Sequence, residues 1–473
     1  MTATLTDPSI ADHGLLTPAQ AGLLTDQYEL AMVASYLRRG MNGPAVFELF
    51  VRHLPPHRDW LLVAGLGPAL ALVEALRFGP EELDYLASLG FGPPLLDHLA
   101  HFRFSGRIDA LPEGTLAFAG EPLLRVTAPR VEAQLLETLL LNQINFQTAI
   151  ATKAARLVLA AGAGFPGGGG AIVDFSPRRD HGIDAAMKAA RAAVIAGAAG
   201  TSNVAAAMRY GLTPVGTMAH SYVMSFPTEL DAFRAFMRDT PENAVLLVDT
   251  FDTVDGVRNA IVAARETGVP LKGVRLDSGD RLALSRAARA LLDRAGMHET
   301  AIVVSGDLDE ARIADLVAAG APVDVWGVGT DLGTSRDSPA VGGVYKLVAD
   351  SLDHGWRPVS KRSPAKATLP GPKQVFRRSA EGVMSEDVLA LADERSDGHP
   401  LLVEVMRDGR ALHQDSLDDL RARAATNLRM RPRGPYRVVL SQRLAELAAA
   451  AQGLEDPRAL AALRQPLPQH GAT

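Results

Sequence analysis

Cysteine is absent from the 473-residue chain, which excludes disulfides, thiolate metal sites and a cysteine nucleophile. Long apolar runs are also absent: residues 192–199 are rich in alanine and glycine and too short to span a bilayer, so we expect no membrane partner. Residues 1–20 lack a basic segment followed by an apolar one, so we expect no secretory signal. These absences favour a cytoplasmic location.

Basic charge is not in excess, because the formal net charge is -6. A general nucleic-acid binder would present a basic surface, so we expect no nucleic-acid partner. Only seven of the 48 basic residues are lysine, yet Lys346, Lys361, Lys366 and Lys373 lie within 28 residues of one another. This cluster is either a solvated basic face or a site for a polyanion such as a phosphate chain.

Short apolar runs of strand character are the most regular feature present. Segments compatible with helices, such as 281–295 and 308–319, lie between most of them, which is typical of βα units with a parallel sheet. Seven runs at this spacing predict an irregular α/β barrel. The runs are residues 171–175, 213–218, 244–249, 271–276, 301–305, 323–328 and 343–348.

The other segments are assigned around this barrel. We expect a flexible N-terminus at 1–20, an α+β domain at 21–148 and the barrel at 149–350. A basic loop and C-terminal extension at 351–473 would pack back on the N-terminal domain. Within these domains we expect a long helix over 132–156, a flexible connector at 167–170, a mobile loop at 351–373 and a disordered tail beyond about 465.

Polar residues follow several of the predicted strands. Segments 174–182 and 275–280 each follow an apolar run, and segment 216–226 places His220 among hydroxyl groups. Active sites of α/β barrels lie at the carboxyl ends of the strands, so we expect these segments to share one pocket. His220 is a candidate catalyst, and the alternative is a hydrogen-bonded core histidine.

Glycines also follow two of the later strands, at 305–307 and 327–330. Glycine there can expose backbone N–H groups to a phosphate, although each glycine alone could simply mark a turn.

Together these motifs resemble the nicotinate phosphoribosyltransferase family. The resemblance implies an N-terminal sandwich domain and a distorted α/β barrel of the type II phosphoribosyltransferase kind. It also implies a head-to-tail homodimer whose active sites use both subunits. The matching segments are 23–32, 45–52, 120–123, 140–146, 174–182, 200–204, 218–221, 275–280 and 327–333.

The reaction that the resemblance implies joins nicotinate to phosphoribosyl pyrophosphate, giving nicotinate mononucleotide and pyrophosphate in NAD biosynthesis. ATP hydrolysis would be coupled through a phosphorylated histidine, and His220 is the matching position. An imidazole nitrogen can accept a phosphoryl group, and Asp249 or Asp277 could orient the ring through its other nitrogen. The alternative for both aspartates is helix capping. We expect Mg²⁺ to accompany the phosphorylated substrates, and no tightly bound organic cofactor.

The resemblance also assigns binding residues. Phe175 and the partner subunit's Tyr28 would stack on the pyridine ring, although both could be core aromatics. Ser202 stands where nicotinamide-using relatives carry aspartate, so with Arg275 it favours the carboxylate of nicotinate. The expected phosphate-binding residues are Arg178, Arg179, Gly306, Gly329, Thr330, Lys346, Lys361 and Lys366.

Two departures and several alternatives remain. The family usually has Phe-Gly before the paired arginines, whereas this chain has Ser176 and Pro177 there, and Asp180-His181 is also unusual. A nicotinamide- or quinolinate-using enzyme, a non-catalytic pyridine-nucleotide sensor and an unrelated aldolase-like barrel are the alternatives. Lys272 begins its strand, which is a poor position for the Schiff base of an aldolase.

Overall fold

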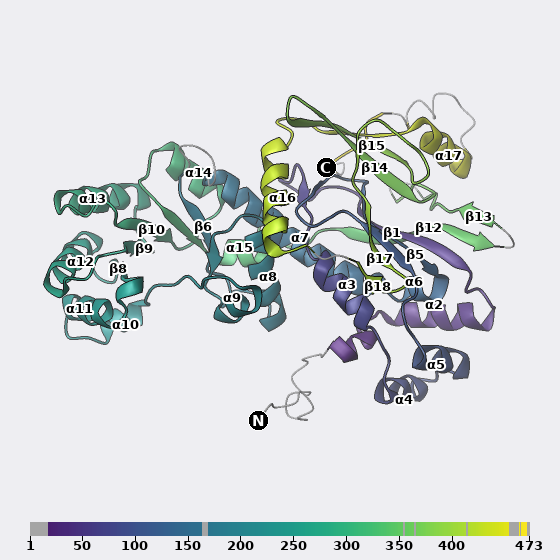
Figure 1. Ribbon diagram of the computed structural model, residues 1–473, viewed down its shortest axis with the longest axis horizontal. Helices are drawn as coiled ribbons and strands as arrows, with labels where there is room; N and C mark the ends of the chain where they lie inside the picture. The colour runs from purple at the N-terminus through teal and green to yellow at the C-terminus, as the bar shows by residue number, and fades with distance from the viewer. Residues whose placement is uncertain are drawn as a thin grey trace. The chain divides into compact units, whose positions relative to one another are not determined.

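The computed structural model describes residues 18–162, 169–352, 355–363, 366–412, 415–453, 463 and 465–470. The chain forms two compact units, one of residues 1–148 with 340–473 and one of residues 149–339 (Figure 1). The expectations for residues 1–17, and for residues 167–168 of the connector predicted at 167–170, lie outside the described residues.

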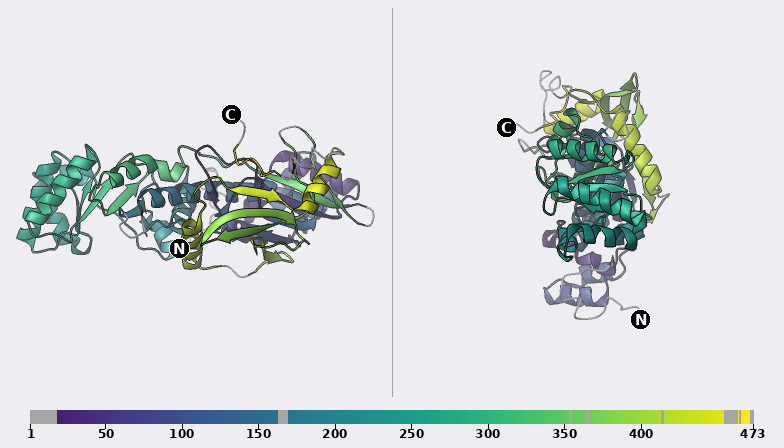
Figure 2. Two further views of the ribbon diagram at one scale, coloured as in Figure 1. Left: turned by 90° about the horizontal axis from the view of Figure 1, so that it is seen from above. Right: turned by 90° about the vertical axis from the view of Figure 1, so that its left-hand side faces the viewer.

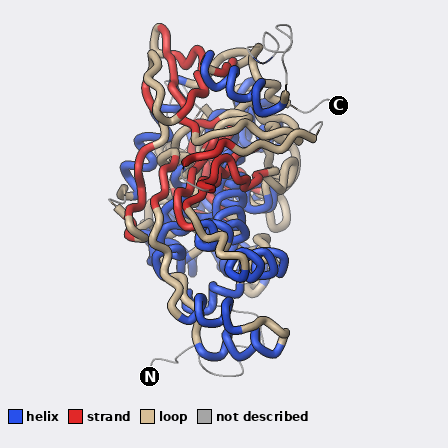
Figure 3. Tube along the Cα trace, turned by 90° about the vertical axis from the view of Figure 1, so that its right-hand side faces the viewer, coloured by secondary structure: helices blue, strands red, loops and turns tan. Residues whose placement is uncertain are grey.

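The first unit is built on a seven-stranded sheet in the order β13-β12-β1-β5-β3-β17-β18. Its strand β1 (Pro44–Val51) is buried along almost its whole length, as expected for a strand covered on both faces. β1 pairs antiparallel with β5 (Pro122–Pro129) and with β12 (Gly343–Leu352). Figure 3 draws all the strands in red and the helices in blue.

The pairing of β12 corrects one prediction, because the run 343–348 was counted among the seven strands of the barrel. That run belongs instead to the sheet of the first unit, so the boundary after the second unit falls at 339 rather than 350. An apolar run predicts a buried strand, but its period does not say which sheet will bury it.

The other elements of the first unit surround this sheet. A second sheet has the order β16-β14-β15-β19, and β2 pairs with β4. The single helix expected over 132–156 is two helices, separated at residues 135–136. These elements are η1 (Pro18–Leu23), α2 (Gln27–Arg38), β2 (Leu61–Leu62), α3 (Leu66–Ala75), α4 (Pro80–Ser88), α5 (Pro93–Ala100), β3 (Arg107–Ala110), β4 (Leu116–Ala117), α6 (Arg130–Gln134), α7 (Glu137–Ala160, which continues into the second unit), β13 (Gly355–Pro358), β14 (Lys373–Ala380), β15 (Val383–Leu391), β16 (His399–Pro400), β17 (Val403–Arg407), β18 (Arg410–Ala411), α16 (Leu417–Met430), β19 (Arg437–Leu440) and α17 (Gln442–Gln452).

The C-terminal segment 465–470 is held against the first unit. The Leu467 N–H donates to the carbonyl of Val438 at 2.8 Å, and the Leu54 N–H donates to the carbonyl of Gln469 at 2.6 Å. The prediction of a disordered tail is therefore wrong for these residues, while residues 471–473 lie outside the described ones. Part of the predicted loop at 351–373 is also regular, because β13 pairs with β12.

The second unit contains a six-stranded parallel sheet in the order β7-β6-β11-β10-β9-β8. Helices α11, α12 and α13 lie in front of it in the right-hand view of Figure 2. The α/β class and barrel-like βα repeat are confirmed. The elements are β6 (Ala171–Asp174), α8 (Ile183–Ile195), β7 (Gly200–Thr201), α9 (Val204–Tyr210), α10 (His220–Met224), α11 (Glu229–Asp239), η2 (Pro241–Asn243), β8 (Val245–Leu247), α12 (Thr253–Thr267), β9 (Gly273–Leu276), α13 (Arg281–Arg294), β10 (Ala301–Ser305), α14 (Glu310–Ala318), β11 (Val325–Val328) and α15 (Thr330–Thr334).

One expected strand of this unit, 213–218, does not form. The segment makes a single bridge between Thr201 and Pro214 and is otherwise irregular. The Val215 N–H donates to the Thr201 carbonyl at 2.9 Å, but the ladder does not extend beyond this bridge in the described chain. His220 consequently begins helix α10 instead of ending a strand.

In the described part of the chain, no helix is both long and apolar enough to cross a membrane.

Candidate active site

A cavity of about 260 Å³ lies at the carboxyl ends of four neighbouring strands, β6, β9, β10 and β11. Residues from two of the predicted segments, 174–182 and 275–280, lie around this cavity. The glycine-containing segments 305–307 and 327–330 also line it. Parallel strands place their carboxyl ends along one edge of a sheet, which explains the gathering. The lining residues are Phe175, Arg178, Arg179, Arg275, Asp277, Ser305, Gly306, Asp307, Leu308, Gly327, Gly329, Thr330, Asp331 and Arg336.

Arg275, on β9, organises the centre of this pocket. Its Nε donates to Ser305 Oγ at 2.8 Å, its Nη1 to Thr217 Oγ1 at 3.0 Å and its Nη2 to Asp277 Oδ1 at 2.6 Å. The bond to Thr217 fastens the irregular segment that precedes His220. Arg275 thus fixes groups from three parts of the chain around one cation.

Asp277 is held as a carboxylate by its neighbours. Burial raises the pKa of Asp277, but hydrogen bonds from Ser305 and Arg275 and the positive charge of Arg275 outweigh it, so the pKa lies below its ordinary value. Ser305 Oγ donates to Asp277 Oδ1 at 2.5 Å. The carboxylate is therefore ionised throughout the neutral range.

Asp249, which follows the neighbouring strand β8, supports the loop after β9. Its Oδ2 accepts from the Asp277 N–H at 2.9 Å and from Ser278 Oγ at 2.7 Å, and its Oδ1 is buried without a hydrogen-bond partner in the described chain. Helix capping, the alternative considered for Asp249 and Asp277, falls to other residues. Asp252 caps α12 and Asp280 caps α13.

His220 lies close enough to Asp277 for its charge to lower the pKa of that carboxyl. Its ring nitrogen Nδ1 lies 3.1 Å from Thr250 Oγ1. The partner of this nitrogen is thus a hydroxyl, whereas the sequence had allowed for the carboxylate of Asp249 or Asp277. A hydroxyl can fix the ring as a carboxylate can, and sequence order gave no reason to choose it.

Phe175 forms the apolar part of the pocket. The Arg275 guanidinium carbon lies 5.6 Å from the centroid of the Phe175 ring, within cation–π range. A Cβ at position 327 would come within 2.5 Å of the same ring, so glycine is required there. Phe175 is 8% exposed and borders the cavity, which combines both roles considered for it, core aromatic and pocket wall.

The predicted phosphate residues of this unit lie around the cavity. Arg178 and Arg179 are exposed, which leaves both guanidinium groups accessible to solvent. Gly306 has φ +81°, and a Cβ there would clash with the Asp277 carbonyl oxygen. Gly329 and Thr330 line the cavity where β11 passes into α15.

Ser202 follows β7 and is not among the residues that line the cavity. Its N–H donates to the Asp174 carbonyl at 2.8 Å, while its Oγ is buried without a partner among the described residues. Asp174 is itself fully buried and accepts hydrogen bonds from Thr201 Oγ1 and the Ser176 N–H.

The unusual residues around Pro177 form a local network. Ser176 Oγ donates to Asp180 Oδ2 at 3.1 Å, and Asp180 Oδ1 is buried without a partner in the described chain. Burial raises the pKa of Asp180 to about 6, although the Ser176 hydrogen bond opposes the shift. The departure from the family pattern therefore places a titratable group next to the paired arginines.

The remaining predicted residues belong to the first unit. Tyr28 is 48% exposed, and burial followed by the charges of Glu137 and Glu29 raises its pKa above the ordinary value. Lys346 Nζ lies 3.4 Å from Glu137 Oε1, so Glu137 links Tyr28 and Lys346. Lys361 and Lys366 are exposed.

Several residues in or next to the pocket were not selected from the sequence. Ser305 could have been chosen, because a hydroxyl directly before a strand-end glycine is a visible signal. Thr250 contacts His220 and Thr217 accepts a hydrogen bond from Arg275, so both matter only through residues distant in the sequence. Arg336 lies beyond α15, and no sequence motif marks it. These three required the tertiary structure.

Comparison with known proteins identifies the family. The model of the nicotinate phosphoribosyltransferase N-terminal domain matches residues 23–145, and that of the nicotinate phosphoribosyltransferase family matches residues 171–381. The chain is 46% identical over 404 residues to nicotinate phosphoribosyltransferase pncB2 of Mycobacterium tuberculosis, covering 84% of this chain and 85% of that protein. The chain belongs to the nicotinate phosphoribosyltransferase family.

A second relative and two solved structures also resemble this chain. A Bacillus subtilis nicotinate phosphoribosyltransferase is 44% identical over 382 residues, covering 79% of this chain and 76% of the relative. The crystal structure of human nicotinic acid phosphoribosyltransferase superposes with a TM-score of 0.77 at 30% identity, covering 90% of this chain and all of the human one. A Pyrococcus furiosus nicotinate-nucleotide pyrophosphorylase shares the fold, with a TM-score of 0.69 at 24% identity over 86% of this chain and 94% of that one.

Family membership confirms the predicted class, a transferase of the nicotinate phosphoribosyltransferase family. The whole strand-end pocket, from Phe175 to Arg336, falls within the catalytic-domain match at 171–381. Tyr28 falls within the N-terminal match at 23–145.

Proposed function

We propose that this chain transfers the phosphoribosyl group of phosphoribosyl pyrophosphate to nicotinate, giving nicotinate mononucleotide and pyrophosphate for NAD biosynthesis. The observation that carries the proposal is the strand-end pocket. It places an aromatic ring and Arg275 next to two solvent-accessible arginines and two glycine-bordered turns. An aromatic acid and a chain of phosphates are the ligands that such a surface complements.

The transfer passes through a cationic ribosyl state, and the residues act mainly by position and charge. Phe175 provides the flat surface for the pyridine ring. Asp277, ionised and fixed by Arg275 and Ser305, is the negative group available to the ribose cation. Arg178 and Arg179 would neutralise the departing pyrophosphate.

His220 is proposed as the phosphoryl acceptor that couples ATP hydrolysis to the transfer. If its Nδ1–H donates to Thr250, the lone pair of Nε2 is free to attack the terminal phosphorus of ATP, and ADP leaves. The phosphoryl group would leave later as inorganic phosphate on hydrolysis. Thr250 would therefore select the reactive tautomer.

Magnesium is proposed to enter with the substrate phosphates. In the described chain, no cluster of three acidic or histidine side chains could hold a metal alone. Asp249 and Asp277 nevertheless fit the one or two carboxylates that Mg²⁺ takes alongside phosphate oxygens, and Asp249 Oδ1 is a buried oxygen without a partner among the described residues. When bound, the ion would neutralise phosphate charge.

Product formation tests the function directly. The protein with Mg²⁺ and phosphoribosyl pyrophosphate is given nicotinate, nicotinamide or quinolinate, with and without ATP, and mononucleotides are followed by mass. We expect nicotinate mononucleotide, formed faster with ATP. Product from another base would replace the proposed substrate, and no product from any base would favour a non-catalytic sensor.

Two histidine variants test the coupling. We expect His220→Ala to abolish ATP-dependent acceleration while a slow uncoupled transfer remains. His298→Ala is the control, because His298 is exposed and contacts Asp293. If His220→Ala still hydrolysed ATP in proportion to the mononucleotide it forms, another residue would be the phosphoryl acceptor.

We also propose a cytoplasmic head-to-tail homodimer in which Tyr28 of the partner subunit completes each pocket. Its support is that Tyr28 and Lys346 gather around Glu137 on the unit that lacks the strand-end pocket, with Tyr28 half exposed. Tyr28→Ala and His220→Ala homodimers would each lose coupled activity. When the two variants are mixed and refolded, about half of the dimers should contain one subunit of each kind, and one of the two sites in such a dimer is intact. About a quarter of the coupled activity should therefore return. No recovery would contradict the shared site.

A further inference from the structure

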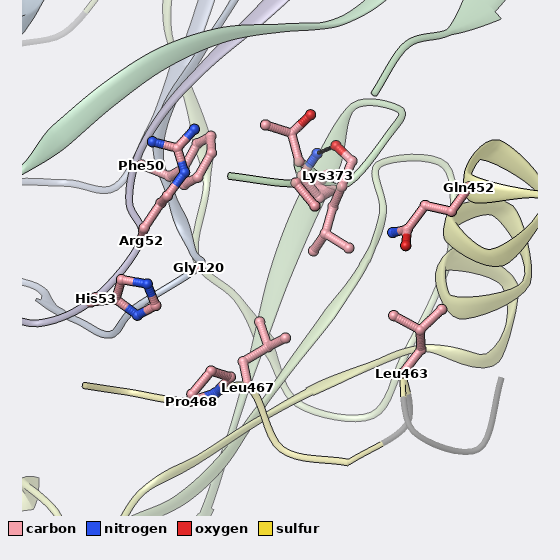
Figure 4. A pocket seen from close by; sticks show the side chains of 12 residues that line it. Phe50, Arg52, His53, Gly120, Lys373, Gln452, Leu463, Leu467 and Pro468 are labelled. Atoms are coloured by element: carbon pink, nitrogen blue, oxygen red, sulfur yellow. Dashed lines mark hydrogen bonds between the residues drawn. The ribbon is translucent and has the colours of Figure 1, made fainter. Parts of the chain in front are cut away.

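The first unit contains a second cavity, of about 310 Å³, that shares no residue with the strand-end pocket. It lies between the end of β1, the turn at Gly120, residues 367–373 and the C-terminal segment 465–470. Figure 4 shows Arg52 and His53 on one side and Gln452 and Leu463 on the other. Its volume is at the lower end of the range for small-molecule sites, about 300–1,000 Å³.

The walls of this cavity are mainly apolar and carry no acidic side chain among the described lining residues. The apolar lining residues include Phe50, Leu369, Leu467 and Pro468. A ligand with an apolar body would therefore displace water from these side chains favourably.

The two cations of the cavity differ in their partners. Lys373 Nζ is 2.7 Å from Glu48 Oε2 and donates to the carbonyls of Leu369 and Gly371, so its charge and hydrogen bonds are satisfied. Arg52 has no carboxylate partner in the described chain, and its Nε is buried without an acceptor. Its contact is with the face of Phe50, 5.7 Å from the guanidinium carbon.

The C-terminal segment is fastened where it forms the wall. The Ala119 N–H donates to Gln469 Oε1 at 2.9 Å, next to the Leu54 and Leu467 backbone bonds described above. Gly120 has φ +86°, and a Cβ there would lie 2.7 Å from Leu467 Cδ1. A glycine at this turn thus lets Leu467 close the cavity.

We propose that this cavity binds an amphipathic organic anion, such as a medium-chain or aromatic carboxylate. The acidic group would accept hydrogen bonds from Arg52, and the apolar body would pack between Phe50 and Leu467. An anion supplies what Arg52 lacks, because a partly buried guanidinium gains most from a charged acceptor. The proposal does not depend on the transferase function.

The test uses 1-anilinonaphthalene-8-sulfonate as a fluorescent probe on the folded full-length chain, with octanoate and its neutral counterpart 1-octanol as competitors. We expect one saturable site from which octanoate displaces the probe. Saturating nicotinate with phosphoribosyl pyrophosphate should not displace the probe. Absence of saturable binding, or displacement by these substrates, would overturn the proposal.

Three variants locate the site. Arg52→Gln should weaken octanoate about tenfold or more, as expected for a lost charge-assisted hydrogen bond, and leave octanol unchanged. Leu369→Trp fills the cavity and should abolish binding of both competitors. Arg39→Gln removes an exposed arginine of the same unit outside the cavity and should bind like the unmodified chain.

Each contrary result is equally specific. Unchanged octanoate affinity in Arg52→Gln would remove the basis for anion recognition. Equal weakening in Arg39→Gln would show diffuse surface attraction instead of a site. If Arg52→Gln did not fold, as judged by circular dichroism, Leu369→Trp would still decide, since retained binding there excludes the cavity.

Discussion

Lys153 neutralises three carboxylates inside the second unit, so Lys153→Met should destabilise that unit strongly. The lysine side chain is 1% exposed, and its Nζ lies 2.5 Å from Glu310 Oε2, 2.6 Å from Asp331 Oδ1 and 3.0 Å from Asp337 Oδ1. These contacts join α7 to the first turn of α14, to α15 and to the loop beyond it. Methionine keeps the length of the side chain and removes the charge.

The expected loss is about 3 kcal/mol, the lower end of the roughly 3–5 kcal/mol that follows removal of one partner from a buried ion pair. The lower end applies because Asp337 is 32% exposed and water screens part of the repulsion. Lys188→Met is the matched control. Its partner Asp184 is 77% exposed, so that loss should be at most about 0.5 kcal/mol.

Urea unfolding at several pH values measures both variants. Burial lowers the pKa of Lys153, but Glu310 and Asp331 outweigh it and raise the pKa above its ordinary value, so the stabilisation in the unmodified chain is fully present at and below neutral pH. In Lys153→Met the three carboxylates lose this positive charge, so their pKa values should rise. Protonation would then reduce the deficit as the pH falls from 8 towards 5.

Two results would refute this reasoning. One is a loss below about 1 kcal/mol, similar to that of the control pair. The other is a deficit that does not change with pH, which would show that lost packing and not the lost positive charge is responsible. Because Asp331 also lines the strand-end pocket, we expect a higher KM for phosphoribosyl pyrophosphate in the same variant.

Three further predictions concern the site. Gly306→Ala should lower the unfolding free energy by about 1–2 kcal/mol for its left-handed backbone, and by more because the new Cβ displaces Asp277; kcat should fall as well. Gly296→Ala is the control, because a Cβ there meets open space. It should lose only the backbone contribution and keep its activity. Asp180→Asn should raise the Tm at pH 8, because the pKa of Asp180 in the folded chain is about 6 and its charged form destabilises the fold above that pH. The gain in unfolding free energy should be at most about 1 kcal/mol, since water screens the group. It should vanish as the pH falls towards 4, where Asp180 is protonated in the folded chain. An unchanged Tm difference between pH 8 and 5 would contradict the assigned titration. Ser202→Asp should shift the kcat/KM preference from nicotinate towards nicotinamide, and an unchanged ratio would mean that the carboxylate is recognised elsewhere.

The sequence determined the features that depend on local pattern. Apolar runs alternating with helical segments gave the parallel βα repeat, and the carboxyl ends of parallel strands must meet at one edge of the sheet. Phe175, Arg178 and Arg275 could therefore be placed around one pocket from their positions at the ends of strands. The family motifs lie in the same segments, because chemistry at that edge constrains the residues there.

The tertiary structure decided which distant segments pair. The apolar run 343–348 predicts a buried strand that could belong to either unit. Only its pairing with β1 assigns it to the first unit. His220 meets Thr250 and not a carboxylate, because the hydroxyl is brought there by a separate loop. The segment 465–470 looks too polar to order itself, yet it is held by hydrogen bonds to Val438 and Leu54. Local propensity fixes the element, whereas long-range contacts fix its partner, and those contacts have no short-range signature in the chain.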